Sequence, residues 1–436
     1  MNILVFSRAA WDPTNSLGNT VTNFFSHWTE DVFSHFYTRK SLPKNDSVSL
    51  YYNVSATDVP KDLFRKKRTH CFTKDDLSSL ADSYRTAHEK EQRSIDRIHK
   101  KKSSLIYFLT EQIWLSRLWQ GKDFRAFVKQ ADPDIFFAFA TNAYLLWPMI
   151  RYVRKHTHAK IVLFAADDIH NRDLKYPFYR RCYLAPLLKK CICEADRVYA
   201  ISDALCEKYS QLYSKDVHLL LKGCEFNFPV SQTVKTHLRI AYAGNLYYGR
   251  AEILAKIAKT LQTLNANGTR AALEIYTPTT VDETLDKALN VPGSSRVMGP
   301  RPYEEIKRIL HDADLVLHVE SFEPEQIDYV KNSFSTKIID CLQSGSGILA
   351  VGPAGITSIE YLRQIEGTTV IDDLSSLEAE LTTLIDAAEE IPNRAAAIRK
   401  YATEHHDLEQ VQTKLRREFL DLLTSSEQSE SDRKPL

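Results

Sequence analysis

Short apolar runs that end in polar turns recur through the first half of the chain, and patterns with helical spacing follow them. Near-continuous apolar runs of this length are typical of strands buried on both faces of a parallel sheet. The pattern therefore predicts a doubly wound α/β domain. Its predicted strands are NILVFS (2–7), DIFFAFA (134–140), KIVLFAADD (160–168) and RVYAIS (197–202).

The second half repeats this alternation of apolar runs and helical patterns, which predicts a second domain of the same kind. A chain of 436 residues is also too long for one compact core. The predicted strands of the second domain are LRIAYAG (238–244), AALEIYT (271–277), DLVLHVE (314–320) and SGILAVG (346–352).

The join between the halves is expected in FNFPVSQTVKTH (226–237), which follows neither periodicity and contains Pro229. Near the end, LEQVQTKLRREFLDLL (408–423) has apolar residues at helical spacing, and a Ser- and Glu-rich tail follows it. The predicted organisation is a first domain (1–228), a hinge (229–237), a second domain (238–407), a helix packing back on the first domain (408–425) and a disordered tail (426–436).

The charge balance excludes one class of partner. The chain has 57 Lys and Arg against 56 Asp and Glu, so no global field would steer nucleic acid to it. The first apolar run has the length of a strand and follows Met1 directly, unlike a signal peptide, so we expect a cytoplasmic protein.

The seven cysteines are scattered, and their odd number suits free thiols in a reducing compartment better than a set of disulfides. Cys191 and Cys193 form a C-x-C pair, but no second pair of Cys or His lies at ligand spacing. We therefore expect buried thiols there and no metal.

Residues 61–130 differ from the rest because basic clusters, RKKR (65–68) and HKKK (99–102), precede the aromatic run SLIYFLTEQIWLSRLW. Residues 99–119 could lie against an anionic membrane surface, with Lys and Arg at the headgroups and aromatic rings in the interface. They could equally form a helix packed on the sheet beside a solvated charged segment. The chain has no run of twenty apolar residues, so no membrane span is predicted.

Polar residues at the ends of the predicted strands mark the candidate site, because ligands of open parallel sheets bind beyond the carboxyl ends of the strands. Arg250 follows the turn after Gly244, where its planar guanidinium would suit a diphosphate; alone, it could equally be a surface arginine. The segment NSFSTK (332–337) precedes a helical pattern, and its amides, hydroxyls and Lys337 could bind an anion there. One turn further on, the Asp340 carboxylate could accept hydrogen bonds from a ribose diol.

With these motifs in place, the second half resembles the donor domain of family 4 glycosyltransferases, which have the GT-B architecture. The two acids of that family's Glu-x7-Glu motif fall on Asn332 and Asp340, with Ser333, Phe334 and Ser335 in place of its Gly-Phe-Gly. The resemblance implies that the first position contacts the donor sugar and the second binds the nucleotide ribose. Asn332 cannot act as a carboxylate, so Glu320 is a candidate substitute.

The resemblance also implies a cationic pair on the donor diphosphate, which we assign to Arg250 and Lys337 because Asn245 replaces the arginine of the family's G-R-L turn. The GNLYYGR turn and SFSTKIIDCLQSG look like those of bacterial enzymes of cell-surface polysaccharide synthesis. In the first half, NSLGNT resembles the family's glycine loop, and AADDIH falls where the family often has a His-Asp pair. For both, a plain loop at a strand end is an equally good interpretation.

The resemblance thus implies two Rossmann-like domains facing a central cleft, and a retaining, metal-independent glycosyltransferase that needs no cofactor. Its donor would be a nucleoside-diphosphate sugar and its acceptor a saccharide or a polyprenyl-linked saccharide, at the inner face of the plasma membrane. Two alternatives stay open: a non-catalytic partner that binds nucleotide sugar or membrane, and a GT-B sugar-nucleotide epimerase. The predicted catalytic residues are Asp168, His170, Glu320 and Asn332, and the predicted donor-binding residues are Gly18, Gly244, Asn245, Arg250, Thr277, Ser333, Phe334, Ser335, Thr336, Lys337 and Asp340.

Overall fold

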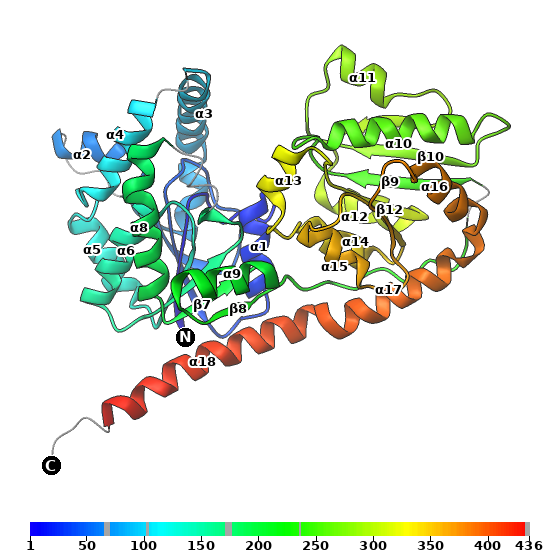
Figure 1. The fold of residues 1–436 in the computed structure, drawn as a ribbon. Helices are drawn as coiled ribbons and strands as arrows, with labels where there is room; N and C mark the ends of the chain where they lie inside the picture. The colour runs from blue at the N-terminus through cyan, green and yellow to red at the C-terminus, as the bar shows by residue number, and fades with distance from the viewer. Residues whose placement is uncertain (65–69, 102–103, 171–176, 235–236, 432–436) are drawn as a thin grey trace. The chain divides into compact units, whose positions relative to one another are not determined.

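The computed structural model describes residues 1–436 except 65–69, 102–103, 171–176, 235–236 and 432–436 (Figure 1). Its internal contacts divide the chain into two units. Unit 1 consists of Met1–Leu220 and Gln412–Leu436, and unit 2 of Leu221–Val411.

Unit 1 is built on an eight-stranded sheet with the order β4-β3-β2-β1-β5-β6-β7-β8, in which only β3 and β4 pair antiparallel. The four predicted strands are confirmed as β1, β5, β6 and β7. The strands β2, β3, β4 and β8 were not predicted; β2 has polar Ser34 and His35 inside it, which interrupt the apolar run. The bounds are β1 Asn2–Ser7, β2 Val32–Tyr37, β3 Val48–Asn53, β4 Cys71–Thr73, β5 Ile135–Phe139, β6 Lys160–Ala165, β7 Arg197–Ala200 and β8 Val217–Leu219.

Helices connect most consecutive parallel strands of unit 1, because a parallel pair needs a crossover connection. The connection from β2 to β3 (38–47) contains no helix. Phe24 of the first helix is fully buried and contacts the rings of Phe137 and Phe164 on the sheet edge-on. The bounds are α1 Ser16–Phe25, α2 Asp58–Phe64, α3 Leu77–Lys101, α4 Ser104–Leu115, α5 Lys122–Ala131, α6 Ala143–His156, α8 Phe178–Glu194 and α9 Asp203–Tyr213, with a 3-10 turn at Lys74–Asp76.

Unit 2 has a six-stranded sheet with the order β11-β10-β9-β12-β13-β14, and all its strands are parallel. The four predicted strands are confirmed as β9, β10, β12 and β13. The chain returns from the edge strand β11 to β12, beside β9, so the strand order reverses between β9 and β12. Loops that leave the carboxyl ends of strands at such a point lie side by side and commonly bind ligands.

The strands of unit 2 are β9 Leu238–Ala243, β10 Ala271–Tyr276, β11 Ser295–Gly299, β12 Leu315–Val319, β13 Gly347–Val351 and β14 Thr369–Ile371. Its helices are α10 Arg250–Leu264, α11 Glu283–Leu289, α12 Tyr303–Asp312, α13 Pro324–Val330, α14 Lys337–Ser344, α15 Thr357–Arg363, α16 Leu377–Asp386 and α17 Ile391–His406, with a 3-10 turn at Ala388–Glu390.

The segment that leads into unit 2, from Leu221 to Ser231, contacts residues of unit 2. Cys224 forms a parallel bridge with Asp407, and Arg399 donates from Nη1 to the Phe228 carbonyl oxygen (3.0 Å). The Ser231 amide donates to the Gly345 carbonyl oxygen (2.9 Å). Unit 2 thus begins at Leu221, while the predicted boundary at 228 and the hinge at 229–237 stay predictions.

The last helix, α18 (Leu408–Ser431), joins unit 1 from Gln412 onward (Figure 1). Gln412 donates to the Asn23 carbonyl oxygen (2.7 Å), Arg416 pairs with Asp31 (2.8 Å), and Phe419 is fully buried. The helix continues to Ser431, beyond residue 426 where we expected a disordered tail. A helix whose first turns are already formed adds further residues at low cost, since nucleation is the expensive step.

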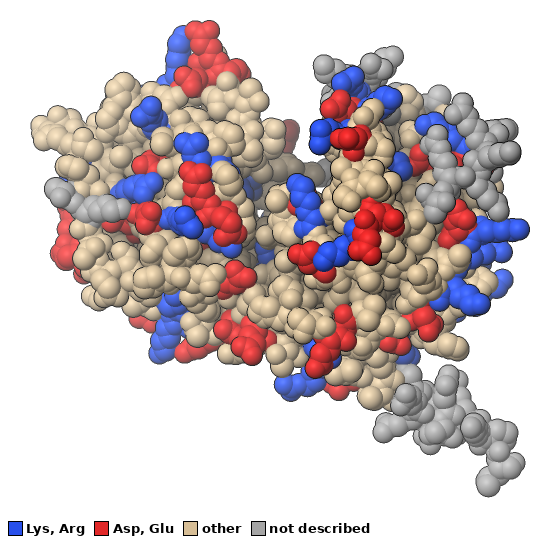
Figure 2. Space-filling model, turned by 180° about the vertical axis from the view of Figure 1, so that it is seen from behind, with Lys and Arg blue, Asp and Glu red and all other residues tan. Residues whose placement is uncertain are grey.

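The surface charges and the state of the cysteines are those expected from the nearly equal numbers of acidic and basic residues and the odd number of cysteines. Figure 2 shows acidic and basic side chains interspersed over the visible face. All seven cysteines are free thiols, as predicted.

Among the described residues, no helix combines the length and the apolar character needed to cross a bilayer. The side chains of the basic clusters 65–68 and 99–102, on which the membrane hypothesis partly rested, lie outside the described residues.

Phe419 should be the anchor of α18, because its ring contacts Phe25, Trp28 and Phe137. We expect Phe419→Ala to lower the free energy of unfolding by about 3–5 kcal/mol, as for other buried phenylalanines. Urea denaturation measures this. The matched control is Leu420→Ala on the exposed side of the same helix, for which we expect a change within about 0.5 kcal/mol. Equal losses in the two variants would contradict the assignment.

Candidate functional site

A tight turn after β9 brings Arg250 to the centre of unit 2. Tyr248 (φ 60°) and Gly249 (φ 71°) are both left-handed, which reverses the chain before α10 begins. Glycine is needed at 249, because a Cβ there would lie 2.3 Å from the Ser321 Oγ. The turn therefore packs directly on the segment that follows β12.

The Arg250 guanidinium is buried, with 8% of the residue exposed, and three partners hold it. Its Nε donates to the Val319 carbonyl oxygen (3.2 Å), Nη1 to the Asn245 Oδ1 (3.0 Å), and Nη2 to the Glu320 carboxylate (3.1 Å). A guanidinium has five N–H donors, so one N–H of Nη1 is not used by these bonds. Asn245 thus positions the arginine that we expected on a diphosphate.

Glu320 is the counter-ion of Arg250, a role that the sequence did not predict. Burial alone would raise the pKa of its carboxyl, but His318, whose Nε2 lies 3.4 Å away, and Arg250 outweigh burial and lower that pKa. The carboxylate is therefore ionised and balances the guanidinium charge. The expected contact between Glu320 and a donor sugar stays a prediction.

Lys337 is the first residue of α14. Unlike Arg250, it forms no ion pair with a described residue. Part of the side chain is exposed, but Nζ is buried and has no hydrogen-bond partner among the described residues. Burial and the neighbouring Arg250 lower the pKa of Lys337 to about 8. Glycine at 244 leaves room for the ammonium, because a Cβ there would lie 1.9 Å from Nζ.

The backbone before α14 supplies further positive potential, since the first amides of a helix have no intrahelical acceptor. The first hydrogen bond of this helix runs from the Ile338 amide to the Ser335 carbonyl oxygen (3.0 Å). The amides of Thr336 and Lys337 come before it in the chain, so they are the ones directed out of the helix start. The Ser335 amide is already used, because it donates to the Ser358 Oγ (2.9 Å).

Asp340 lies one turn further along α14. Its Oδ1 accepts hydrogen bonds from the Tyr303 hydroxyl (2.7 Å) and the Gln343 amide (3.3 Å). Burial raises the pKa of this carboxyl, while the positive charge of Lys222 acts in the opposite direction. Lys222 is itself buried. It could not be predicted from the sequence, because it lies outside the motif, in the segment that enters unit 2.

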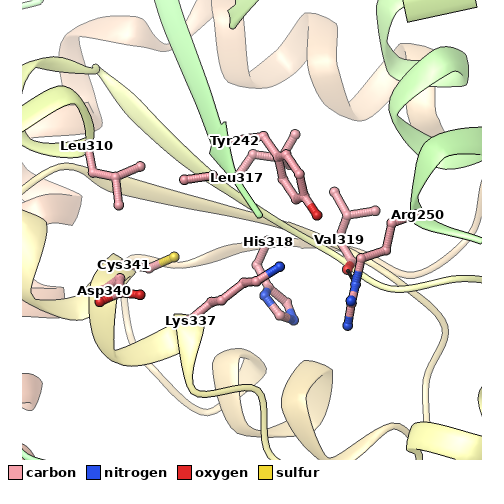
Figure 3. A pocket seen from close by; sticks show the side chains of 10 residues that line it. Tyr242, Arg250, Leu310, Leu317, His318, Val319, Lys337, Asp340 and Cys341 are labelled. Carbon is pink, nitrogen blue, oxygen red and sulfur yellow. Dashed lines mark hydrogen bonds between the residues drawn. The ribbon is translucent and has the colours of Figure 1, made fainter. Parts of the chain in front are cut away.

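Arg250, Lys337 and Asp340 line one small cavity of about 20 Å³, enough for a water molecule. Figure 3 shows Lys337 extending into it from α14, with Arg250 opposite on α10 and Tyr242 above. The lysine Nζ lies 5.4 Å from the centre of the Tyr242 ring. The remaining lining residues are Ala243, Leu310, Leu317, His318, Val319 and Cys341.

The other predicted residues of unit 2 do not line this cavity. Thr277 is buried at the end of β10, where its hydroxyl accepts a hydrogen bond from the Thr279 amide (3.1 Å). Phe334 is buried edge-on against the Tyr361 ring, with ring centres 5.0 Å apart. Asn332 and Ser333 lie in the turn between α13 and α14. Their roles as donor contacts stay predictions.

The predicted residues of unit 1 have local partners. Gly18 permits a close approach, because a Cβ there would lie 2.1 Å from the Asp12 carbonyl oxygen. Asp168 forms an ion pair with Lys208 (2.6 Å), and the His170 Nδ1 lies 3.3 Å from the Tyr213 hydroxyl. Burial, assisted by Lys208, lowers the pKa of His170. No contact described here tests a catalytic role for either residue.

Comparison with known proteins identifies the fold. No family profile matches the sequence, and no curated protein does. Solved structures do match along nearly the whole chain. Sucrose-phosphate synthase from Thermosynechococcus elongatus is 10% identical with a TM-score of 0.62, and the alignment covers 97% of this chain and 99% of that one.

Two further similar structures contain a nucleotide. An Escherichia coli trehalose-6-phosphate protein bound with UDP-2-fluoro glucose is 12% identical, with a TM-score of 0.57 and coverage of 96% and 98%. Anabaena HepE in complex with UDP and glucose is 10% identical, with a TM-score of 0.60 and coverage of 96% and 99%. The chain therefore has the GT-B fold, as predicted, with two parallel-sheet α/β domains.

Lys337 should cost the free protein stability, because its buried ammonium forms no hydrogen bond with any residue that the structure describes. We expect Lys337→Met to raise the free energy of unfolding at pH 7 by about 1–3 kcal/mol, the usual cost of an unsatisfied buried group. The unfolded chain keeps the lysine proton up to its ordinary pKa, whereas the folded chain releases it near pH 8. Wild type therefore gains stability between these two values, and its difference from Lys337→Met should shrink there.

Urea denaturation of wild type and Lys337→Met measures this difference in the free energy of unfolding. The two conditions are pH 7 and pH 9.5, the second being ~1.5 pH units above the pKa of Lys337 in the folded protein. The control is Lys331→Met, since Lys331 is more exposed and pairs with Asp328 at 3.6 Å. A Lys337→Met variant that is less stable than wild type at pH 7 would show that the ammonium has a stabilising partner.

Glu320 should be essential to the stability of unit 2, because its removal leaves the guanidinium buried without a counter-ion. We expect Glu320→Gln to lower the free energy of unfolding by about 3–5 kcal/mol. Glu323→Gln, at an exposed position on the same loop, is the control and should be close to wild type. If the two variants unfold at the same urea concentration, Arg250 does not depend on Glu320.

Proposed function

We propose that the chain is a glycosyltransferase that moves a sugar from a nucleoside-diphosphate sugar to a saccharide or lipid-linked acceptor. The finer hypotheses are retention of anomeric configuration, independence of metal ions and a place in cell-surface polysaccharide synthesis at the inner face of the plasma membrane. They rest on the resemblance of the GNLYYGR turn and of residues 332–345 to family 4 enzymes. The GT-B fold supports the general activity without specifying the donor or acceptor.

One observation carries the proposal: the Lys337 ammonium is buried beside Arg250 and the start of α14, and no described residue forms a hydrogen bond with it. An unpaired buried charge is costly, so a chain that retains one is expected to use it. An anion in this place would gain charge-assisted hydrogen bonds from the ammonium and from amides at the helix start. A diphosphate has the charge and the several oxygens that such a site can bind.

The chemistry follows from where charge develops. The acceptor hydroxyl oxygen forms a bond to the anomeric carbon, while the bond between that carbon and the diphosphate oxygen breaks and leaves its electron pair on the phosphate. The proton of the acceptor hydroxyl passes to the departing phosphate oxygen. Lys337 and the helix amides stabilise the leaving group as its negative charge grows.

Arg250 contributes less positive charge to the leaving group than an arginine without a counter-ion would. Glu320 balances its charge, so its contribution is a rigid N–H donor at the edge of the site. A pre-oriented donor loses little entropy when the ligand arrives. Lys337 is then the main source of positive charge for the leaving group.

Asp340 is proposed to bind the ribose of the donor, since a carboxylate can accept hydrogen bonds from both hydroxyls of a diol. Tyr303 and Gln343 orient it by donating to Oδ1. Oδ2 accepts neither of those two bonds. UDP is the nucleotide to test first, because the E. coli and Anabaena structures contain UDP or a UDP sugar.

Nucleotide binding tests this site directly. We expect UDP to bind wild type, and Lys337→Met to bind it about 10- to 100-fold more weakly, which corresponds to the loss of one charged hydrogen bond. Isothermal titration calorimetry measures both, and Lys331→Met is the control that should keep wild-type affinity. If Lys337→Met binds UDP as tightly as wild type, the assignment of Lys337 is wrong.

The pH dependence gives an independent check. Lys337 loses its proton as the pH rises through about 8, so UDP affinity of wild type should fall above that pH. The affinity of Lys337→Met should lack this fall. A wild-type affinity that is constant from neutral pH to well above 8 would mean that the ammonium does not contact the nucleotide.

Turnover separates the three hypotheses for function. Incubation with a UDP sugar and an acceptor should release UDP and a glycoside with the donor's anomeric configuration, and EDTA should leave the rate unchanged. Nucleotide binding without any product would support the non-catalytic alternative. Conversion of the donor sugar to its epimer, with no release of UDP, would support the epimerase.

A further inference from the structure

A groove of about 610 Å³ lies in unit 1, where α4 and α8 pack against α6. It belongs to unit 1 alone, whereas the cavity described above belongs to unit 2. More than half of its lining is apolar or aromatic: Phe108, Leu115, Trp147, Pro148, Tyr183, Pro186 and Leu187. A groove of this size and composition suits the apolar part of a ligand.

Three cations also line this groove: Arg117, Arg151 and Lys190. Each is exposed, and no ion pair with a described residue is found for any of them, while no acidic residue is among the described lining residues. Neighbouring arginines differ, since Arg154 pairs with Asp196 and Arg180 with the buried Glu111. The groove therefore combines three cations with no acidic side chain among its described lining residues.

Exposed apolar side chains occur close to the groove in sequence and in space. Phe178 and Leu118 are 74% and 54% exposed, and Leu109 and Tyr179 are also exposed. The ring centre of Tyr179 lies 6.1 Å from that of Phe108 in the groove. Large apolar side chains grouped in this way mark a surface that is covered in use.

Arg117 is held in a left-handed backbone conformation (φ 60°), which favours glycine over arginine. Strained backbone positions cluster at functional sites, so Arg117 is a candidate contact for a ligand of the groove. Glycine at this position would relieve the strain, so Arg117→Gly removes the charge without a threat to folding.

We infer that this groove binds an anionic phospholipid of a bilayer, with the phosphate on the three cations and the start of the hydrocarbon chain along the apolar lining. Bound soluble anions would leave the apolar lining and the exposed Phe178 and Leu118 in water. An amphiphile presented by a membrane covers both the cations and the apolar surface. The inference extends the proposed function, because a lipid-linked acceptor would be reached at the same membrane.

Vesicle cosedimentation tests the groove with a charge-reversed variant, Arg117→Glu/Arg151→Glu/Lys190→Glu. Its matched control, Lys122→Glu/Lys129→Glu/Lys155→Glu, changes the net charge equally at exposed positions of α5 and α6 outside the groove. We expect wild type and the control to sediment with vesicles of phosphatidylcholine and phosphatidylglycerol. The groove variant should partition at least about tenfold less, since each surface cation contributes to binding anionic lipid. Arg117→Gly should show a smaller loss.

Trp147 gives a second measurement that reports the location of the lipid. The other four tryptophans, Trp11, Trp28, Trp114 and Trp119, are each at most 5% exposed, whereas Trp147 is half-buried in the groove. Brominated phosphatidylglycerol in the vesicles should quench the fluorescence of wild type. Trp147→Phe should bind the same vesicles but lose most of that quenching.

Three results would overturn the inference: sedimentation of the groove variant equal to wild type, equal losses in groove variant and control, or unchanged quenching in Trp147→Phe. Failure of wild type to bind vesicles would also overturn it, and would favour a soluble anion or an acidic protein as the occupant. UDP titration of the same proteins keeps the two proposals apart. The groove variant should bind UDP normally, so a loss of vesicle binding with normal UDP binding concerns the groove alone.

Discussion

Positive charge held inside unit 2 is the constraint on which the candidate site depends. Two cations lie next to the same cavity, and the chain treats them differently: Arg250 forms a buried ion pair with Glu320, while the Lys337 ammonium has no hydrogen bond or ion pair with a described residue. A buried ion pair is stable only when its remaining hydrogen-bonding groups are satisfied. Val319 and Asn245 accept further hydrogen bonds from the guanidinium, which leaves one N–H of Nη1 unused. The Lys337 ammonium makes no hydrogen bond with a described residue, so its environment is the one that a bound anion would complete.

Sheet topology explains why these groups meet. Arg250 follows β9, Glu320 follows β12, and the order of the strands reverses between these two neighbours. Loops from both strands therefore reach the same place, and α14 adds its amino end and Lys337 to it. The glycines at 244 and 249 allow the close approach, because a side chain at either would collide with Lys337 or Ser321. The backbone conformation at these glycines is therefore as important as the side chains for the placement of Arg250 and Lys337.

Much of this could be predicted from the sequence, for identifiable reasons. Strands buried on both faces leave continuous apolar runs, so β1, β5 and β9 were found, whereas Ser34 and His35 hid β2. Lys337 and Asp340 follow from spacing on one helix. The counter-ion role of Glu320 and the nearness of Lys222 and Tyr303 to Asp340 could not be predicted. They join segments far apart in sequence, and no local pattern records such contacts.

The cavity wall also contains a thiol, that of Cys341 on α14. Burial, with the nearby Asp340, raises the pKa of this thiol to about 12, so at physiological pH almost none of it is thiolate. Electrophiles and peroxides react with thiolates, and they would find little to attack at this position. The proposed nucleotide site should therefore tolerate oxidising conditions and alkylating reagents that inactivate enzymes with reactive cysteines.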